Sequence, residues 1–288
     1  MILLCELCGK LCVPCVKINR KVCKVILETI EKLFSEKISG RIVNDQNNFK
    51  NTMLDINCDL AEGMSDDARI MPYITSANIA CGFHAGSSDM MKRTVDLCIQ
   101  HKVKIGAHPS FLDKENFGRT EMQVPDDVLK GWITEQILTL KKICADAGTA
   151  LHHVKPHGAL YNMSARDAHL ARLIAETIKI IDKNLVLYGL SGSVSITEAA
   201  KIGLQTANEV FSDRTYQNNG TLTSRSQKNA LIENVDVAMQ QLLHIIKDKK
   251  VTTVSGDEIP VSAQTVCIHG DGKHALMFAK KIFQTLNI

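Results

Sequence analysis

The sequence predicts an α/β fold in which about seven parallel strands close into a barrel. Two observations support this prediction. Short apolar runs alternate with longer helical runs from residue 53 onward, and unusual polar residues recur where the short runs end. A doubly wound parallel sheet is the alternative that the same alternation allows.

The elements follow one another at regular intervals. Seven short segments are predicted as strands: 53–58, 75–81, 103–107, 150–155, 185–190, 204–210 and 265–269. Six longer segments are predicted as helices: 87–101, 126–147, 167–182, 193–202, 233–248 and 272–285. Ser87, Asp126 and Ser193 stand near three helix starts, where such side chains cap free backbone N–H groups. Residues 53–288 are therefore predicted to form one barrel domain.

Residues 1–52 are predicted to be an extension outside that domain. Their cysteines form two CxxC pairs only three residues apart, a gap far shorter than the roughly 12 to 20 residues of common zinc modules. An amphipathic helix is predicted over residues 21–37, followed by a polar stretch of linker composition. Because Met53 opens the first strong strand, a misassigned start upstream of it is a competing interpretation. The clustered cysteines are Cys5, Cys8, Cys12, Cys15 and Cys23.

Charge and hydropathy exclude several classes of protein. Residues 1–52 hold nine Lys and Arg against five Asp and Glu, whereas the remaining residues hold 25 against 26. The barrel domain therefore offers no overall basic field for nucleic acid. No run approaches the roughly 18 apolar residues of a membrane span. The five cysteines after residue 50 are scattered in apolar segments, which is typical of reduced thiols in a cytoplasmic protein.

The candidate active site lies at the carboxyl ends of the predicted strands, which converge on one face of a parallel barrel. Four histidines have Gly or Pro within two residues, in GFHAG, GAHPS, KPHG and IHGDG: His84, His108, His157 and His269. One such histidine fits a structural role, but four together predict a shared catalytic centre. The other polar residues at these ends are Asn57, Asp59, Glu62, Asn78, Lys155, Glu209, Asp213, Arg214 and Asp271.

Two chemistries are open for this centre. Asp59, His84, His108 and His157 are the ligand types of a divalent-metal hydrolase, in which the metal activates water and polarises a carbonyl. Without a metal, the same residues could act as general acid and base, with Lys155 stabilising an oxyanion or a phosphate. The spacing does not choose between them, because the residues come from separate strands rather than from a local signature.

A long polar loop is predicted after the sixth strand. The segments FSDRTY and GTLTSRSQ, within residues 211–227, carry Arg214, Arg225 and Ser226, which suit a carboxylate or a phosphate. A solvated loop with ordinary surface arginines is the alternative. The sequence contains neither GxxxxGK[ST] nor a strand-linked GxGxxG, so it has no standard phosphate loop.

Seven segments carry a family resemblance: LDINCDLAEG, SANIACGFHAG, KIGAHPSF, NFGRTEM, HHVKPHGALYN, EVFSDRTYQNNGTLTSRSQ and VCIHGDG. In this order and spacing they resemble the LamB/YcsF family, almost continuously over residues 53–288. The resemblance implies a barrel related to the glycoside hydrolase/deacetylase superfamily. It also implies ATP-dependent opening of the 5-oxoproline lactam to L-glutamate, with ADP and phosphate as co-products, in a cytoplasmic complex with two further subunits, B and C.

The family motifs fall on thirteen positions of this chain. Six are predicted to be catalytic: Asp59, Glu62, His84, His108, Lys155 and His157. Seven are predicted to bind substrate: Asn57, Asn78, Arg214, Arg225, Ser226, His269 and Asp271. A metal, if one is bound, would be held by Asp59, His84, His108 and His157. Because no standard phosphate loop exists, ATP is expected either to bind here unconventionally or to bind mainly to a partner chain of the complex.

Individual roles are hypotheses at this stage. Asp59 or His157 is expected to activate water, and Lys155 with Arg214 is expected to face phosphoryl or oxyanion charge. Asn78 with His84 is expected to orient the lactam ring. Two alternatives remain: a metal-dependent deacetylase or amidohydrolase acting on a carbohydrate-like substrate, and a non-catalytic scaffold that only supports its partners.

Overall fold

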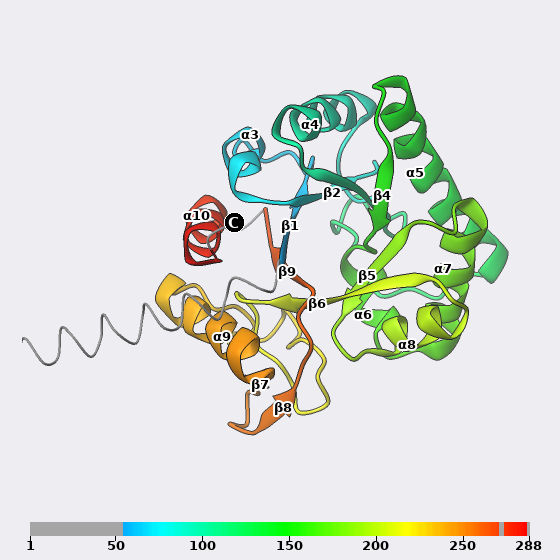
Figure 1. Cartoon of the computed structure of the whole chain (residues 1–288). Coiled ribbons are helices and arrows are strands. Elements are labelled where there is room, and N and C mark those ends of the chain that lie inside the picture. The colour runs from blue at the N-terminus through cyan, green and yellow to red at the C-terminus, as the bar shows by residue number, and fades with distance from the viewer. Residues whose placement is uncertain (1–53, 271–273, 287–288) are drawn as a thin grey trace, which may run out of the picture. The chain divides into compact units, whose positions relative to one another are not determined.

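Seven parallel strands form a closed barrel, in the order β1-β2-β3-β4-β5-β6-β9 (Figure 1). The computed structural model describes residues 54–270 and 274–286. The prediction of a seven-stranded barrel is confirmed, and the doubly wound alternative is wrong. The strands are β1 (Asp55–Leu60), β2 (Ser76–Ala80), β3 (Lys104–His108), β4 (Leu151–Val154), β5 (Val186–Leu190), β6 (Gln205–Phe211) and β9 (Thr265–Ile268).

The predictions for residues 1–52 fall outside the described residues, and so does Asp271. The extension, its cysteine pairs and its helix over residues 21–37 therefore stay predictions.

Helices surround the barrel (Figure 1). All six predicted helices are present, and the short helices α3, η1 and α6 were not predicted. The helices are α3 (Asp67–Ile70), η1 (Met71–Tyr73), α4 (Ser88–His101), α5 (Asp126–Asp146), α6 (Gly158–Ser164), α7 (Ala168–Ile181), α8 (Val194–Lys201), α9 (Val235–Asp248) and α10 (Ala275–Leu286). Within the described residues no helix has the length and apolar character needed to cross a membrane.

Helix caps follow the sequence signals in part. Ser87 caps α4 by accepting a hydrogen bond from the Met90 backbone N–H. Asp126 instead lies in the first turn of α5, where the positive end of the helix dipole stabilises a carboxylate. Ser193 is the N-cap residue of α8, but its side chain makes no capping hydrogen bond.

The two faces of the barrel strands differ in chemistry. Along β1, the side chains of Ile56, Cys58 and Leu60 belong to the buried apolar core. The alternate residues Asn57 and Asp59 are also buried, but they hydrogen-bond to polar side chains of other strands. The barrel interior is therefore polar, whereas apolar layers fill the interior of most parallel barrels.

A small antiparallel hairpin, β7 (Lys250–Thr252) and β8 (Glu258–Pro260), precedes the last barrel strand and was not predicted. It helps to order the long loop that follows β6. Tyr216 of that loop bridges to Leu222 and to Thr253, which directly follows β7, and Arg214 bridges to Leu231. The predicted loop is thus folded back on itself.

The packing of the hydrophobic core can be tested on two neighbouring residues of α5. Ile137 is fully buried, whereas Leu138 is 48% exposed. Ile137→Ala is expected to lower the free energy of unfolding by about 2–5 kcal/mol, because it leaves a cavity in a packed core. Leu138→Ala is expected to cost less than about 1 kcal/mol. Urea unfolding measures both, and equal losses would contradict the assigned packing.

Candidate functional site

A cavity of about 510 Å³ lies at the carboxyl ends of the barrel strands. It brings together nine of the predicted site residues: Asp59, Glu62, His108, Lys155, His157, Arg214, Arg225, Ser226 and His269. His84, Asn57 and Asn78 are buried behind this lining rather than in it. Lining residues that the sequence analysis did not select include Arg119, Glu121, Tyr161 and Arg166.

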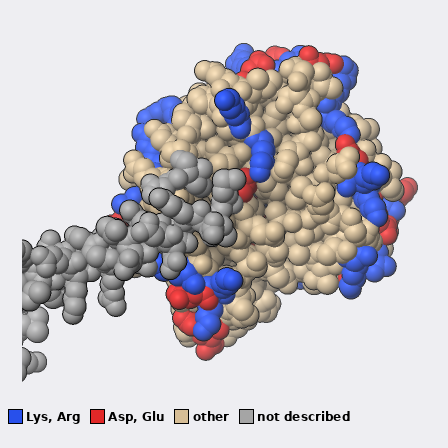
Figure 2. Space-filling view, viewed as in Figure 1, with Lys and Arg blue, Asp and Glu red and all other residues tan. Residues whose placement is uncertain are grey.

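The charged residues that line the cavity are of two kinds. Asp59, Glu62, Lys155 and Arg214 are buried, whereas Arg119, Glu121, Arg166 and Arg225 are exposed. On the face of the molecule shown in Figure 2, Lys and Arg alternate with Asp and Glu mainly around the rim, and uncharged residues cover most of the middle. That face carries no continuous field of one sign over its described part. The charges in the depth of the cavity therefore come from the buried residues at the strand ends, and three arginines and Glu121 add exposed charges to its lining.

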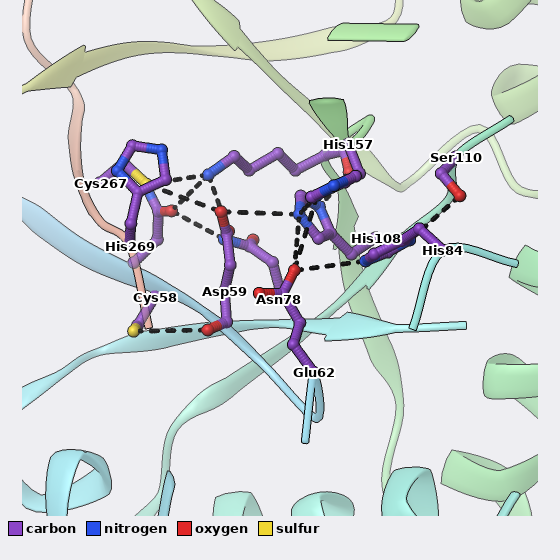
Figure 3. Close-up of polar contacts among 12 residues, drawn as sticks. Cys58, Asp59, Glu62, Asn78, His84, His108, Ser110, His157, Cys267 and His269 are labelled. Atoms are coloured by element: carbon purple, nitrogen blue, oxygen red, sulfur yellow. Dashed lines mark hydrogen bonds and ion pairs between the residues drawn. The ribbon is translucent and has the colours of Figure 1, made fainter. Parts of the chain in front are cut away.

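Three histidines and one glutamate converge at one side of the cavity (Figure 3). Glu62 Oε1 lies 3.2 Å from His84 Nε2, 3.9 Å from His108 Nε2 and 3.6 Å from His157 Nδ1. His157 Nδ1 also lies 2.9 Å from His108 Nε2, and the His84 and His157 rings stack with centroids 3.7 Å apart. All four residues are buried.

The outer ring nitrogens of these histidines show where their protons lie. His108 Nδ1 lies 2.7 Å from the Lys155 carbonyl, and His157 Nε2 lies 2.9 Å from the Phe117 carbonyl. Since a carbonyl oxygen only accepts, both nitrogens donate. His84 Nδ1 likewise donates to Ser110 Oγ, because that hydroxyl gives its own proton to the Phe111 carbonyl.

The inner nitrogens therefore present lone pairs to one another whenever the rings are neutral. Burial and the neighbouring His108 lower the pKa of His84 to about 2. Burial, with His84 and His108, holds the pKa of His157 well below its ordinary value. Lone pairs that face one another and a carboxylate repel unless a cation lies between them.

The geometry of this group fits a divalent cation. The four ligand atoms lie within 4.8 Å of one another. Metal–ligand bonds of about 2.1 Å in a tetrahedron give ligand separations of about 3.4 Å, close to the 2.9–3.9 Å distances found here. Donation by the outer nitrogen to a fixed oxygen is the usual second layer of a histidine metal site.

Asp59 was predicted to be a metal ligand with the three histidines, but the structure brings Glu62 to them instead. Asp59 is held by Lys155, whose Nζ lies 2.8 Å from Asp59 Oδ1. Asp59 Oδ2 still lies 3.5 Å from His108 Nε2, so this carboxylate sits between the histidine group and Lys155.

Lys155 is the charged centre of the barrel. Its Nζ lies 2.9 Å from Glu209 Oε1, 3.0 Å from Cys267 Sγ and 3.3 Å from Asn57 Oδ1. Burial by itself would lower the pKa of Lys155, but Asp59, Cys267 and Glu209 outweigh it and hold the pKa well above its ordinary value. Lys155 therefore carries its positive charge at neutral pH.

Asp59 is correspondingly ionised. Burial would raise its pKa, but Lys155 and then His108 hold the pKa well below its ordinary value. The Lys155 ammonium also fills the place of a cation in a second group of ligand types, formed by Asp59, Cys267 and His269.

The loop after β6 contributes both a support and exposed groups. Arg214 is buried and donates to the carbonyls of Thr223 and Ala230, so it fastens the loop. Burial, together with nearby Arg225, lowers the pKa of Arg214 to about 10. Arg225 and Ser226 are exposed and line the cavity. His269 lies 2.9 Å from Asp213 through Nδ1 and stacks on Phe211.

Two buried residues of the site were not selected from the sequence. Glu209, near the end of the sixth predicted strand, was named among the polar residues at the strand ends but was given no catalytic or binding role, and it pairs with Lys155. His153 lies inside the barrel and was missed altogether. Strand alternation could have identified His153. It lies two residues before Lys155 and four before His157, and residues at this spacing share one face of a strand.

Comparisons with known proteins agree with one another. The LamB/YcsF family model matches residues 54–288. A protein of Tolumonas auensis, named as the A subunit of 5-oxoprolinase, is 48% identical over 234 residues, which cover 80% of this chain and 93% of that protein. One of Histophilus somni with the same name is 46% identical over 233 residues, covering 81% and 94%. The crystal structure of a lactam utilization protein from Thermus thermophilus superimposes with a TM-score of 0.76 at 37% identity, covering 81% of this chain and 96% of that one.

The buried charge cluster is tested by removing its cation. Lys155→Met is expected to cost about 3–5 kcal/mol of unfolding free energy, because two buried carboxylates lose their shared partner. Adding Glu209→Gln to that variant removes one of these charges and is expected to recover part of the loss. Urea unfolding of both variants measures the difference. A double variant no more stable than Lys155→Met would contradict the pairing.

Proposed function

Since this chain belongs to the LamB/YcsF family, we propose that it is the A subunit of an ATP-dependent 5-oxoprolinase, which opens the lactam of 5-oxo-L-proline to give L-glutamate. The observation that carries the proposal is identity of 46–48%, over more than nine-tenths of their length, with relatives that are named as the A subunit of 5-oxoprolinase. Two further subunits, B and C, complete the enzyme in this proposal. The free, buried cysteines of the described residues suit a cytoplasmic location.

The cavity suits a small, charged cyclic amide. Arg225 and Ser226 at the exposed loop offer a guanidinium and a hydroxyl for the substrate carboxylate. The lactam carbonyl would then lie toward His157 and Asp59 in the depth of the cavity. A cavity of about 510 Å³ leaves room beyond one small ring, so a phosphoryl group can also enter.

In the proposed reaction water adds to the lactam carbonyl carbon, the ring C–N bond breaks, and the nitrogen takes up a proton to become the amine of glutamate. A lactam is a poor electrophile, and coupled conversion of ATP to ADP and phosphate, which consumes a second water, drives the step. The chain has no standard phosphate loop, so the proposal places most of the ATP contacts on a partner chain of the complex.

Asp59 lines the cavity, and its Oδ2 lies 3.5 Å from His108 Nε2, whereas its Oδ1 is held by Lys155. It orients the attacking water by accepting a hydrogen bond. Its low pKa makes it a weak proton acceptor, so it holds the water rather than removing its proton. The Lys155 ammonium keeps this carboxylate charged and offsets negative charge that develops above it.

A divalent cation forms the second part of the proposal. Glu62, His84, His108 and His157 would hold it through the four converging ligand atoms. When bound, it would polarise a carbonyl and lower the pKa of a bound water.

Metal analysis tests this part. The purified chain is expected to contain about one zinc or other divalent ion per molecule, since three histidines and a carboxylate are ligand types that zinc prefers. Glu62→Ala and His108→Ala are expected to lose it, whereas Asp59→Asn is expected to keep it. Elemental analysis after dialysis gives the stoichiometry. Wild-type protein that stays metal-free after incubation with zinc would refute the cation site.

One observation favours a second candidate, a metal-dependent deacetylase or amidohydrolase acting on a carbohydrate-like substrate. Glu62 and the three histidines around it supply a complete set of metal ligands within this one chain. Such an enzyme would act without ATP and without partner chains. Turnover of acetylated sugars by the chain alone would select this candidate.

Glutamate release tests the leading proposal. The chain is combined with its B and C partners, with and without ATP. His157→Ala is expected to lower release at least about 100-fold, because it removes a side chain at the reacting end of the cavity. His169→Ala is the matched control, since His169 is exposed and pairs with Asp126 on the surface. Full activity of His157→Ala, or release without ATP, would contradict the proposal.

A further inference from the structure

Behind the cavity lining, residues of three neighbouring strands form one layer of the barrel interior. Asn78 of β2 lies opposite Gly106 of β3, and Gly106 lies opposite His153 of β4. The His153 ring passes over Gly106 and brings its Nε2 to 2.8 Å from Asn78 Oδ1. A Cβ at position 106 would collide with that ring, so the contact requires glycine there.

The contact decides which way the Asn78 amide faces. Asn78 Oδ1 accepts from His153, and Asn78 Nδ2 donates to Asn57 Oδ1 and to Asp59 Oδ1, each at 2.7 Å. All the amide atoms are therefore used. If the amide turned over, its oxygen would face a carboxylate and a second carbonyl oxygen, and its N–H groups would face a donor.

His153 is itself held in place. Its ring is fully buried and stacks on Tyr188, with centroids 4.0 Å apart and planes 15° from parallel. Its Nδ1 lies 3.2 Å from His152 Nδ1 and can accept the proton of that ring. The remaining nitrogen, Nε2, then carries the proton that Asn78 Oδ1 receives.

The orientation of Asn78 fixes Asp59 in turn. Asp59 Oδ1 accepts from Asn78 and from Lys155, at 2.7 Å and 2.8 Å. Oδ2 is thereby left as the oxygen that faces His108. We infer that His153 is a positioning residue, which acts through Asn78 to fix the Asp59 carboxylate for reaction. The kinetic part of this inference rests on the proposed function, and the structural part does not.

The structural part is tested on the chain alone by hydrogen exchange of the Asn78 side-chain amide, observed by NMR with isotope-labelled asparagine. His153→Phe keeps the stacked ring and removes the donor. It is expected to speed exchange of the Asn78 amide protons about tenfold or more, because one of the three hydrogen bonds of that amide is lost. His153→Gln places an amide N–H near the former Nε2 and is expected to restore slow exchange.

Tyr188→Phe is the matched control. It keeps the stack on His153 and removes only a hydroxyl that contacts Asp55 and Ser76. It is expected to leave exchange at Asn78 unchanged. Unchanged exchange in His153→Phe would overturn the inference. His153→Met gives the same comparison if the phenylalanine variant does not fold, since its flexible side chain fills the space without a donor.

The kinetic part uses the complete enzyme with 5-oxoproline and ATP. His153→Phe is expected to lower kcat about tenfold or more with KM within about twofold, because it misplaces a group that orients water and leaves the substrate contacts intact. His153→Gln is expected to stay within about threefold of wild type, and Gly106→Ala is expected to reproduce the loss by displacing the ring. Unchanged kcat in His153→Phe would refute the kinetic role. A wild-type enzyme that releases no glutamate would refute the proposed function, while the exchange measurement would still decide whether His153 holds Asn78.

Discussion

The Lys155 ammonium is the interaction on which the rest of the site depends. Lys155 directly follows β4, and its ammonium group contacts Asp59 of β1, Glu209 of β6 and Cys267 of β9. A single cation therefore links strands from opposite sides of the barrel. The deeply buried Asp59 carboxylate stays ionised because that cation lies beside it. The charged state of Asp59, and so its use in the reaction, follows from where Lys155 lies.

This arrangement also explains how two acidic residues only three positions apart come to act differently. Asp59 points into the barrel and forms an ion pair with Lys155, whereas Glu62 lies among the three histidines. The chain turns between them at Ala61, whose φ of 61° lies in the left-handed region that favours glycine. The Ala61 N–H donates to Asp67, which helps to hold the turn. The left-handed turn thus separates a carboxylate that stays ionised on Lys155 from one that suits a cation.

The fold and the position of the site could be predicted because their signals are local or topological. Alternating strands and helices predict the barrel, and parallel strands bring His84, His108 and His157 to one end. Which acid would join the histidines could not be predicted, because the turn at Ala61 and competition from Lys155 decide it. Arg214 lines the cavity, as expected for a residue that faces substrate charge, and this role stays a prediction. Its hydrogen bonds to carbonyls of its own loop could not be predicted, because they join residues that the sequence pattern does not pair. The hairpin of β7 and β8 was missed because three-residue strands carry almost no periodic signal.

The polar interior changes what a substitution in this barrel does. In an apolar barrel the interior side chains are fixed by packing, and a substitution mainly changes volume. Here Asp55 accepts from Thr265, Thr265 accepts from Asn57, and Asn57 accepts from Asn78, which also donates to Asp59. Each amide in this column has a donor end and an acceptor end, so reversing one of them leaves its neighbours mispaired. The orientation of Asp59 is thus set by Lys155 together with residues that do not line the cavity, so the interior of the barrel works as part of the site.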